Sequence, residues 1–252
     1  MTMISGKHAV RAVFLARPRS VRRVVLLEGA LRYLQEFVDF AEAAGVKPEV
    51  LPRRAFMQVG DFTEEDRHQG VVAFADPPRL YAEGDLGSLS EASTVLVLDQ
   101  ISNPQNFGTI IRNAAFFGVD AVIWLKNRSA DLSPTVSQVA VGGVEFVKLF
   151  RVTNLARTFE TLKSNGFWVY GLDERGDRTL AETEFDRKAV LVVGAEGEGL
   201  RRRTKEYCDA LVRIPGGRPG LRSLNAGVAT AVALAEVFRQ REAEDRMQKG
   251  AE

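Results

Sequence analysis

Short apolar segments alternate with helical segments from residue 94 onward, and this alternation restricts the folds open to the chain. Residues 95–98 and 121–125 are apolar throughout, and residues 107–117 between them have the apolar spacing of a helix. Strands that are apolar on both faces and joined through helices form a parallel sheet covered on both sides. The predicted fold class is therefore α/β, with further strands at residues 167–172, 189–193 and 210–214.

The last helix is predicted to begin at Ser223, a residue type that commonly caps a helix N-terminus. The apolar residues that follow recur at helical spacing, which predicts that one face of this helix is buried. The residues expected on that face are Leu224, Val228, Val232, Ala235 and Phe238.

Residues 6–73 form a smaller α/β pattern. Strands are predicted at residues 23–28 and 46–51, separated by a helix that ends at Gly45, and residues 67–74 run from a turn into a buried strand. Residues 75–92 contain two prolines, two glycines and several acidic residues without sustained periodicity, which predicts an exposed linker. We therefore expect a small domain over residues 1–76, a linker over 77–92 and a larger domain over 93–252.

The composition is that of a soluble globular protein. Hydrophobic residues make up 45% of the 252 residues and charged residues 27%, and no apolar run is long enough to cross a membrane. The only cysteine, Cys208, cannot form an intramolecular disulfide, and the first residues lack the layout of a signal peptide, so we expect a cytoplasmic protein. Because the net charge is only +1, nucleic-acid binding would depend on local basic patches.

The two histidines, His8 and His68, both lie in the first 70 residues. The larger domain therefore has no imidazole for a Ser-His-Asp or Cys-His arrangement. With two histidines and one cysteine, a zinc site of the usual nitrogen and sulfur type is also disfavoured, and no metal is expected.

The first segment with chemical potential is residues 103–112, Asn-Pro-Gln-Asn-Phe-Gly-Thr-Ile-Ile-Arg, which joins a strand to a helix. Asn106 is predicted to cap the helix N-terminus, and Arg112 follows six residues later. Ligands of open α/β sheets bind at this edge of the sheet. A capped helix with a surface arginine explains the same residues.

The second segment is the glycine-rich turn Gly194-Ala-Glu-Gly-Glu-Gly199, which follows a predicted buried strand. Its order, G-x-x-G-x-G, differs from the G-x-G-x-x-G of dinucleotide-binding proteins, which disfavours a nicotinamide enzyme. Glycines allow the backbone to approach a ligand closely, with Glu196 in the middle of the turn. A tight strand-helix turn without a ligand remains the alternative.

The third segment is residues 214–225, Ile-Pro-Gly-Gly-Arg-Pro-Gly-Leu-Arg-Ser-Leu-Asn, which leads into the last helix. Its serine and leucine have ordinary explanations as a cap and a core residue. Taken together, however, three loops at strand ends are expected to form the walls of one pocket.

These three segments, in this order and at these separations, resemble the motifs of the SpoU/TrmH family of S-adenosylmethionine-dependent RNA ribose 2′-O-methyltransferases. The N-terminal stretches at residues 6–10 and 68–72 are similar to the ribosomal-protein-L30-like (L30e-like) domain of the ribosomal-RNA-modifying branch. The resemblance implies a SPOUT-type α/β domain with a C-terminal trefoil knot, acting as a homodimer through this domain. One departure is that Ala226-Gly227 stands where the family usually has Val-Ser.

The resemblance also implies roles for particular residues. The catalytic residues it implies are Asn106, Arg112, Glu196, Ser223 and Asn225. The residues implied to bind S-adenosylmethionine, largely through the backbone, are Gly194, Ala195, Glu196, Gly197, Gly199, Ile214, Pro215, Ser223 and Leu224.

Methyl transfer from a sulfonium is an in-line displacement, so the protein must chiefly align the ribose oxygen with the methyl carbon. The family mechanism makes the arginine the base, but guanidinium groups in general have a pKa above about 12 and are poor bases. We therefore expect Arg112 to bind an adjacent phosphate and to stabilise the developing alkoxide, with the identity of the base left open.

RNA contacts are expected from three basic clusters. These are Arg17, Arg19, Arg22 and Arg23; Arg53 and Arg54; and Arg201, Arg202 and Arg203 with Lys205. Large-subunit ribosomal RNA is the expected substrate and transfer RNA is the alternative. Two other classes stay open, a non-catalytic RNA-binding homologue and a nucleotide-binding oxidoreductase.

Overall fold

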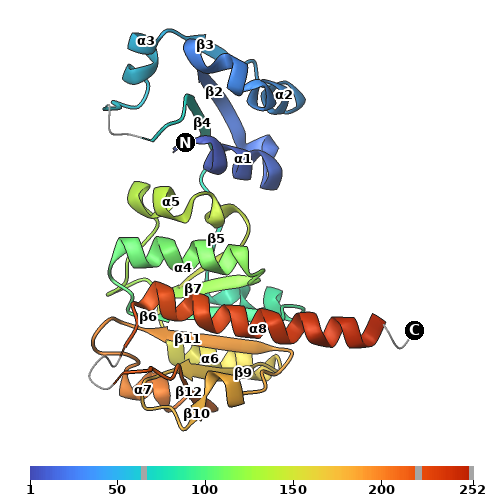
Figure 1. Ribbon diagram of the computed structural model, residues 1–252, viewed down its shortest axis with the longest axis vertical. Helices are drawn as coiled ribbons and strands as arrows, with labels where there is room; N and C mark the ends of the chain where they lie inside the picture. The colour runs from blue at the N-terminus through green and yellow to red at the C-terminus, as the bar shows by residue number, and fades with distance from the viewer. Residues whose placement is uncertain (64–66, 219–222, 250–252) are drawn as a thin grey trace. The chain divides into compact units, whose positions relative to one another are not determined.

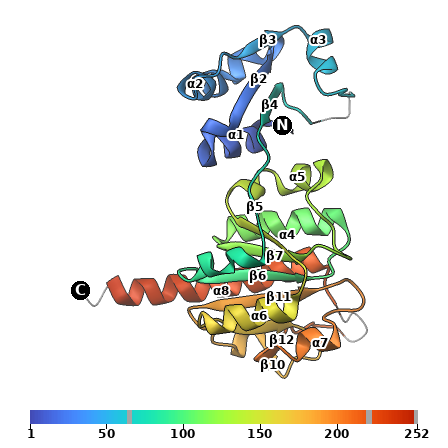
Figure 2. The same cartoon turned by 180° about the vertical axis from the view of Figure 1, so that it is seen from behind.

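The computed structural model describes residues 1–63, 67–218 and 223–249. The chain divides into two units, shown from two sides in Figures 1 and 2. The N-terminal unit comprises Met1–Pro78 and Ala140–Phe146, and the C-terminal unit comprises Arg79–Val139 and Val147–Glu252. Among the described residues, no helix is both long and apolar enough to cross a membrane.

The N-terminal unit contains a four-stranded sheet in the order β1-β4-β2-β3, in which β4 is antiparallel to both its neighbours and β3 is parallel to β2. Its apolar core lies between this sheet and helices α1 and α2. The elements are β1 (Thr2–Ser5), α1 (Lys7–Ala16), β2 (Val21–Leu27), α2 (Gln35–Ala43), β3 (Glu49–Leu51), α3 (Arg53–Gln58), β4 (Val71–Ala75) and 3-10 helices Pro18–Ser20, Glu28–Tyr33 and Gly143–Glu145. The predicted α/β pattern is confirmed, although the strand predicted at 46–51 contains only three residues.

The C-terminal unit contains an eight-stranded sheet in the order β10-β12-β9-β11-β6-β7-β8-β5, and every neighbouring pair is parallel. Its strands are β5 (Leu80–Tyr81), β6 (Thr94–Asp99), β7 (Ala121–Leu125), β8 (Lys148–Val152), β9 (Trp168–Leu172), β10 (Arg178–Thr179), β11 (Ala189–Gly194) and β12 (Ala210–Arg213). The helices are α4 (Pro104–Phe116), α5 (Pro134–Ala140), α6 (Leu155–Ser164), α7 (Arg202–Lys205), α8 (Ala226–Lys249) and 3-10 helices Glu83–Leu89 and Leu180–Glu182. The predicted parallel α/β sheet is confirmed.

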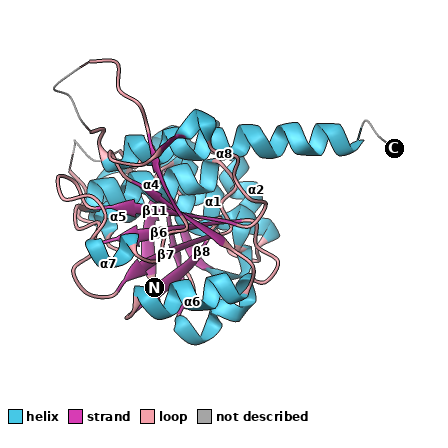
Figure 3. Cartoon of the chain, turned by 90° about the horizontal axis from the view of Figure 1, so that it is seen from below, coloured by secondary structure: helices cyan, strands magenta, loops and turns pink. Residues whose placement is uncertain are grey.

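Both faces of the larger sheet are covered, as the apolar strands require. On one face, Val95 and Val97 of β6 pack with α6 and the 83–89 helix. On the other face, α4 packs against β7, where Phe107 and Trp124 meet edge to face with ring centres 5.2 Å apart. Helix α8 lies beside α4, and Figure 3 shows α6 on the opposite side of the strands.

Residues 77–92 were expected to form an exposed linker, but residues 80–81 and 83–89 form a strand and a 3-10 helix of the C-terminal unit, although many residues of the segment are exposed. Tyr81 of β5 stacks on Phe150 of β8, and the two strands are parallel neighbours. Leu86 and Leu89 of the following 3-10 helix are buried in the core of the C-terminal unit. The apolar spacing of three residues suits a 3-10 helix, and prolines and glycines in the same stretch obscured it.

The expected buried face of the last helix is also wrong. The helix begins at Ala226, and all five residues expected inside are exposed. The buried residues of α8 lie on a face other than the expected one, and most of them are small: Ala226, Gly227, Thr230, Ala233, Leu234 and Val237. Small residues bring α8 close to α4, since a Cβ on Gly227 would lie 2.8 Å from Thr109 Cγ2. This contact gives Gly227, one of the departures from the family pattern, a packing role.

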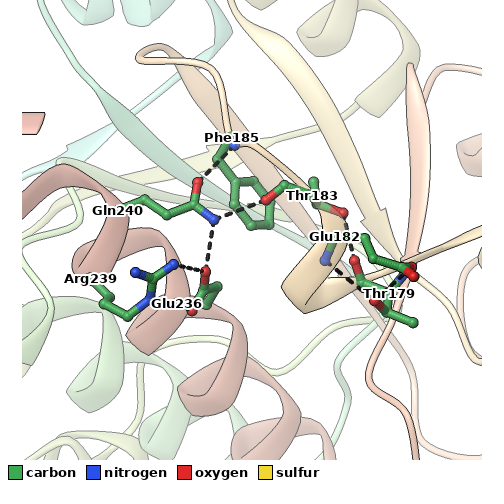
Figure 4. A network of polar contacts seen from close by, with 7 residues as sticks. All are labelled: Thr179, Glu182, Thr183, Phe185, Glu236, Arg239 and Gln240. Carbon is green, nitrogen blue, oxygen red and sulfur yellow. Dashed lines mark hydrogen bonds and ion pairs between the residues drawn. The ribbon is translucent and has the colours of Figure 1, made fainter. Parts of the chain in front are cut away.

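The middle of α8 is held to the sheet by the side-chain amide of Gln240 (Figure 4). Its Nε2 donates to the carbonyl of Thr183 at 2.9 Å, and its Oε1 accepts from the amide of Phe185 at 2.9 Å. Because both groups belong to the backbone between β10 and β11, α8 is anchored at a defined position along the sheet.

Candidate active site

Loops at the carboxyl ends of β9, β11 and β12 meet at a cavity of about 830 Å³. The carboxyl ends of parallel strands lie at one edge of a sheet, where ligands of open α/β folds bind. The start of α8 completes the wall. The structure places at this cavity all nine residues predicted to bind the donor: Gly194, Ala195, Glu196, Gly197, Gly199, Ile214, Pro215, Ser223 and Leu224. Residues 219–222 of the third segment lie outside the described residues.

The glycine pattern of the second segment has a steric cause. The amide of Gly199 donates to the carbonyl of Ala195 at 2.9 Å, so the loop folds back on itself. A Cβ on Gly194 would lie only 2.2 Å from the carbonyl carbon of Gly199, and Gly197 and Gly199 have φ of +80° and +66°. The loop is therefore a tight turn whose backbone faces the cavity, which fits a donor held chiefly by backbone groups.

Asn106 does not cap α4, which corrects the prediction. The cap is Asn103, whose Oδ1 accepts from the amides of Gln105 at 2.8 Å and Asn106 at 3.3 Å. Asn106 instead lies buried in the first turn, and its Nδ2 donates to Glu196 Oε1 at 2.5 Å. The first and second segments are thereby joined by their side chains.

Asn225 connects the third segment to the same cluster. Its Oδ1 accepts from the amides of Gly227 at 2.9 Å and Val228 at 3.2 Å, which caps α8. Its Nδ2 donates to Glu196 Oε1 at 2.6 Å and to Asn106 Oδ1 at 2.9 Å. Asn225, and not Ser223, is thus the capping residue, and it closes a ring of three polar side chains at the cavity edge. We call Asn106, Glu196 and Asn225 the amide–carboxylate cluster.

Arg112 is not part of this arrangement. It is exposed on α4, does not line the cavity, and its guanidinium makes no hydrogen bond or ion pair with the described residues. Phe116 lies one turn further along the same face of α4 and is 80% exposed. Of the five residues predicted to be catalytic, the structure therefore brings four together and leaves Arg112 apart.

Sequence reasoning missed an ion pair in the cavity wall. Asp173 follows directly after β9, its side chain is only 5% exposed, and its carboxylate lies 2.5 Å from Lys205 Nζ. Burial opposes ionisation of Asp173, but hydrogen bonds from Lys205 and the Arg175 amide outweigh it and hold the pKa below its ordinary value. The feature of the sequence that could have indicated this site is an acidic residue immediately after a buried strand.

A second missed acid, Asp99, is fully buried at the carboxyl end of β6. It accepts from the amide of Arg201 at 3.1 Å and from Arg201 Nε at 2.7 Å. This pairing fixes the chain just before α7 against the end of the central strand. Among the described residues, no group of three or more histidine, cysteine or acidic residues is placed to hold a metal ion.

The basic clusters differ in how much of their charge is paired. In the N-terminal cluster, three of the four arginines form ion pairs: Arg17 with Glu145, Arg22 with Asp76 and Arg23 with Glu49. The hydrogen bond from Arg22 lowers the pKa of Asp76, so Asp76 stays ionised to a lower pH than an ordinary aspartate does. Arg53 and Arg54 begin α3.

In the cluster at α7, Arg201 pairs with the buried Asp99. Arg202 is 95% exposed and lies 3.4 Å from Glu206, and Arg203 is exposed without an ion pair among the described residues. The side chain of Arg203 thus leaves unpaired positive charge in solvent beside the cavity loop, and the paired side chain of Arg202 is almost fully exposed.

Comparisons with known proteins agree on one family. Residues 93–235 match the model of the SpoU rRNA Methylase family, and residues 3–81 match the model described as RNA 2′-O ribose methyltransferase substrate binding. The chain is 39% identical over 243 residues to the 23S rRNA (guanosine-2′-O-)-methyltransferase RlmB of Salmonella typhimurium, covering 95% of this chain and 98% of that protein. The same-named protein of Yersinia pestis is 41% identical over 243 residues, covering 95% and 97%.

Solved structures with the same fold include a putative RNA methyltransferase of the TrmH family from Porphyromonas gingivalis, with a TM-score of 0.71, 25% identity and coverage of 94% of this chain and 89% of that one. The SpoU methyltransferase AviRb from Streptomyces viridochromogenes, crystallised with AdoMet, has a TM-score of 0.73, 23% identity and coverage of 95% and 89%. With the family models, the full-length relatives and the site geometry in agreement, the chain belongs to the SpoU rRNA methylase family.

Proposed function

We propose that this protein transfers a methyl group from S-adenosylmethionine to a ribose 2′-hydroxyl of 23S ribosomal RNA. The observation that carries the proposal is the junction of the backbone-lined cavity with the amide–carboxylate cluster, which draws one residue from each of the three sequence segments. The relatives named as 23S rRNA methyltransferases support the choice of ribosomal RNA.

The cavity fits the donor in size and in the character of its walls. Its volume of about 830 Å³ is within the usual range for small-molecule sites, and the close approach of Gly194 to Gly199 leaves backbone amides and carbonyls facing it. Gly194, Ile214 and Leu224 would hold the donor chiefly through backbone groups. When bound, S-adenosylmethionine supplies an activated methyl group on a sulfonium.

The residues of this chain contribute mainly by alignment. Glu196 Oε1 accepts hydrogen bonds from both asparagine amides, so the carboxylate is held in one orientation. Glu196 Oε2 makes no hydrogen bond to the described residues and can accept one from the ribose hydroxyl. Correct placement of two reactants can supply about 7–11 kcal/mol in ideal models, so no covalent nucleophile is required.

We propose that the protein acts as a homodimer through the C-terminal unit. Val228, Val232, Ala235 and Phe238 form an exposed apolar stripe along α8, and Phe117 of the α4 end contacts Phe238 with ring centres 6.0 Å apart. Contiguous apolar stripes of this kind are typical of protein interfaces. A monomer in light scattering at micromolar concentration would contradict this part of the proposal.

A dimer through this stripe would explain the position of Arg112. Arg112 and Phe116 share a face of α4, and the ring of Phe116 meets that of Phe117 with centres 5.0 Å apart, so the arginine would lie beside the proposed interface. We propose that Arg112 binds a phosphate of RNA at the interface. Arg112→Lys keeps the charge but loses the bidentate fork, so kcat/KM should fall at least tenfold; unchanged turnover would refute the bidentate role.

Three further features belong to the proposal. The C-terminal unit is proposed to contain the trefoil knot of SPOUT enzymes, supported by the family match and by the convergence of the loops after β9, β11 and β12. The N-terminal unit is proposed to be L30e-like and to bind RNA, supported by the substrate-binding match. The reaction is proposed to occur in the cytoplasm, where ribosomal RNA is made and assembled in bacteria.

The proposal is tested by donor binding and methyl transfer together. Calorimetric titration should show binding of S-adenosylmethionine and none of NAD. Labelled methyl should then appear at a ribose of a 23S rRNA transcript, and not of transfer RNA, with Asn106→Ala as the inactive control. Binding without transfer would indicate a non-catalytic homologue, and transfer to transfer RNA alone would establish the alternative substrate. Mapping methylated riboses in a deletion strain identifies the nucleotide.

A further inference from the structure

Asp173 differs from the other acidic residues of the donor cavity in being buried. Its side chain is 5% exposed, whereas the side chain of Glu174 is 40% exposed and Glu196 and Glu198 lie at the surface. A Cβ placed on Gly199 would lie 3.9 Å from Asp173 Oδ2, so the carboxylate is across from the glycine loop. Among the described residues of the cavity wall, Asp173 is therefore a buried carboxylate that lies outside the three sequence segments.

Both oxygens of the Asp173 carboxylate have a partner, but the carboxylate can accept further hydrogen bonds. Oδ1 accepts from the amide of Arg175 at 2.9 Å, and Oδ2 pairs with Lys205 Nζ at 2.5 Å. An ionised carboxylate offers about four acceptor positions, so these partners leave roughly two for a ligand. The lowered pKa of Asp173 keeps the group ionised at neutral pH.

The surroundings of Asp173 indicate which part of the donor it meets. The apolar side chains of Leu172, Val212 and Ile214 line the same cavity, and the amide of Asp173 donates to the carbonyl of Val212 at 3.0 Å. A flat purine suits such apolar walls, and the sugar attached to it carries two adjacent hydroxyls. Paired hydroxyl donors match a carboxylate with two acceptor positions to spare.

We propose that Asp173 binds the vicinal ribose hydroxyls of the methyl donor, with Lys205 as the residue that positions it. This inference rests on the proposed function, because it assumes that the cavity is the donor site. It adds a charged side-chain contact to a site whose glycine loop presents backbone.

The test compares three ligands by calorimetry: S-adenosylhomocysteine, its 2′,3′-dideoxy derivative, and 5′-methylthioadenosine, which keeps the sugar but lacks the amino-acid tail. The wild-type protein should bind S-adenosylhomocysteine about 10- to 100-fold more tightly than the dideoxy derivative, since a hydrogen bond to a charged group contributes that much. In Asp173→Asn the ratio of the affinities for S-adenosylhomocysteine and its dideoxy derivative should fall towards one. The affinity for 5′-methylthioadenosine should fall by the same factor as the affinity for S-adenosylhomocysteine.

Lys205→Gln is the matched control, because it breaks the ion pair and leaves the carboxylate in place. It should lower the ratio between S-adenosylhomocysteine and its dideoxy derivative only partly, because the carboxylate remains but is no longer held by Lys205. If Asp173→Asn weakens the binding of S-adenosylhomocysteine and of its dideoxy derivative by the same factor, Asp173 only holds α7 and the inference is overturned. A second variant, Asp173→Ala, checked for an unchanged melting temperature, guards against a local misfold. Weakening that spares methylthioadenosine would place Asp173 at the amino-acid tail and overturn it as well. If the wild-type protein binds none of the three, the proposed function itself fails.

Discussion

Gly194→Ala should damage the donor site by forcing the glycine loop apart. The added Cβ would lie 2.2 Å from the carbonyl carbon of Gly199, 2.3 Å from its oxygen and 2.4 Å from the amide nitrogen of Leu200. All three are backbone atoms, so no side chain can rotate away. Ordinary contact begins near 3.4 Å, and the two arms of the loop must separate by about 1 Å.

The structure sets the size of the expected effect. Overpacking of a close contact lowers the free energy of unfolding by about 1–3 kcal/mol, and separating the arms of the loop would also lengthen the hydrogen bond from Gly199 to Ala195. A displacement of about 1 Å at a site that works by alignment can reduce turnover about 100-fold. We therefore expect Gly194→Ala to fold with a lower melting temperature and to lose about 100-fold in kcat/KM.

The assay is methyl transfer to 23S rRNA, with donor affinity measured by calorimetry and folding by thermal denaturation. Gly217→Ala is the matched control, because Gly217 lines the same cavity and its added Cβ lies within 4 Å of no described residue. The control should stay within about twofold of wild type. If Gly194→Ala also retains wild-type donor affinity and turnover, close packing of the loop does not shape the site.

Three further outcomes follow from named contacts. Asn225→Asp keeps the oxygen that caps α8 but places a second carboxylate against Glu196, so turnover should fall at least about 100-fold while helical content, measured by circular dichroism, is preserved. Val232→Lys should leave the protein folded and halve its molar mass in light scattering, because it puts charge in the middle of the α8 stripe; a mass that does not change argues against that interface. Burial raises the pKa of the Cys208 thiol to about 12, so with Ellman's reagent at pH 8 it should react at least about 100-fold more slowly than a free thiol, and rapid labelling of the native protein would contradict the structure.

The sequence by itself determined the fold class and most of the cavity. Strands apolar on both faces need helices on both sides whatever the rest of the chain does, so the parallel sheet could be predicted from residues 95–98 and 121–125. The glycine turn was equally local, because a close approach at Gly194 and positive φ at Gly197 and Gly199 admit few other residues. Loops at the ends of parallel strands then had to meet at one edge of the sheet.

Only the tertiary structure decided which partner each remaining residue has. An apolar stripe on α8 has the same periodicity whether it faces a core or the surface, and the small residues Ala226 and Gly227 turned a different face towards α4. An asparagine side chain can cap a helix or bind a residue of another segment. In this structure Asn103 caps α4, and Asn106 instead donates to Glu196. Such choices depend on distances between segments far apart in the chain, which local patterns of residues do not contain.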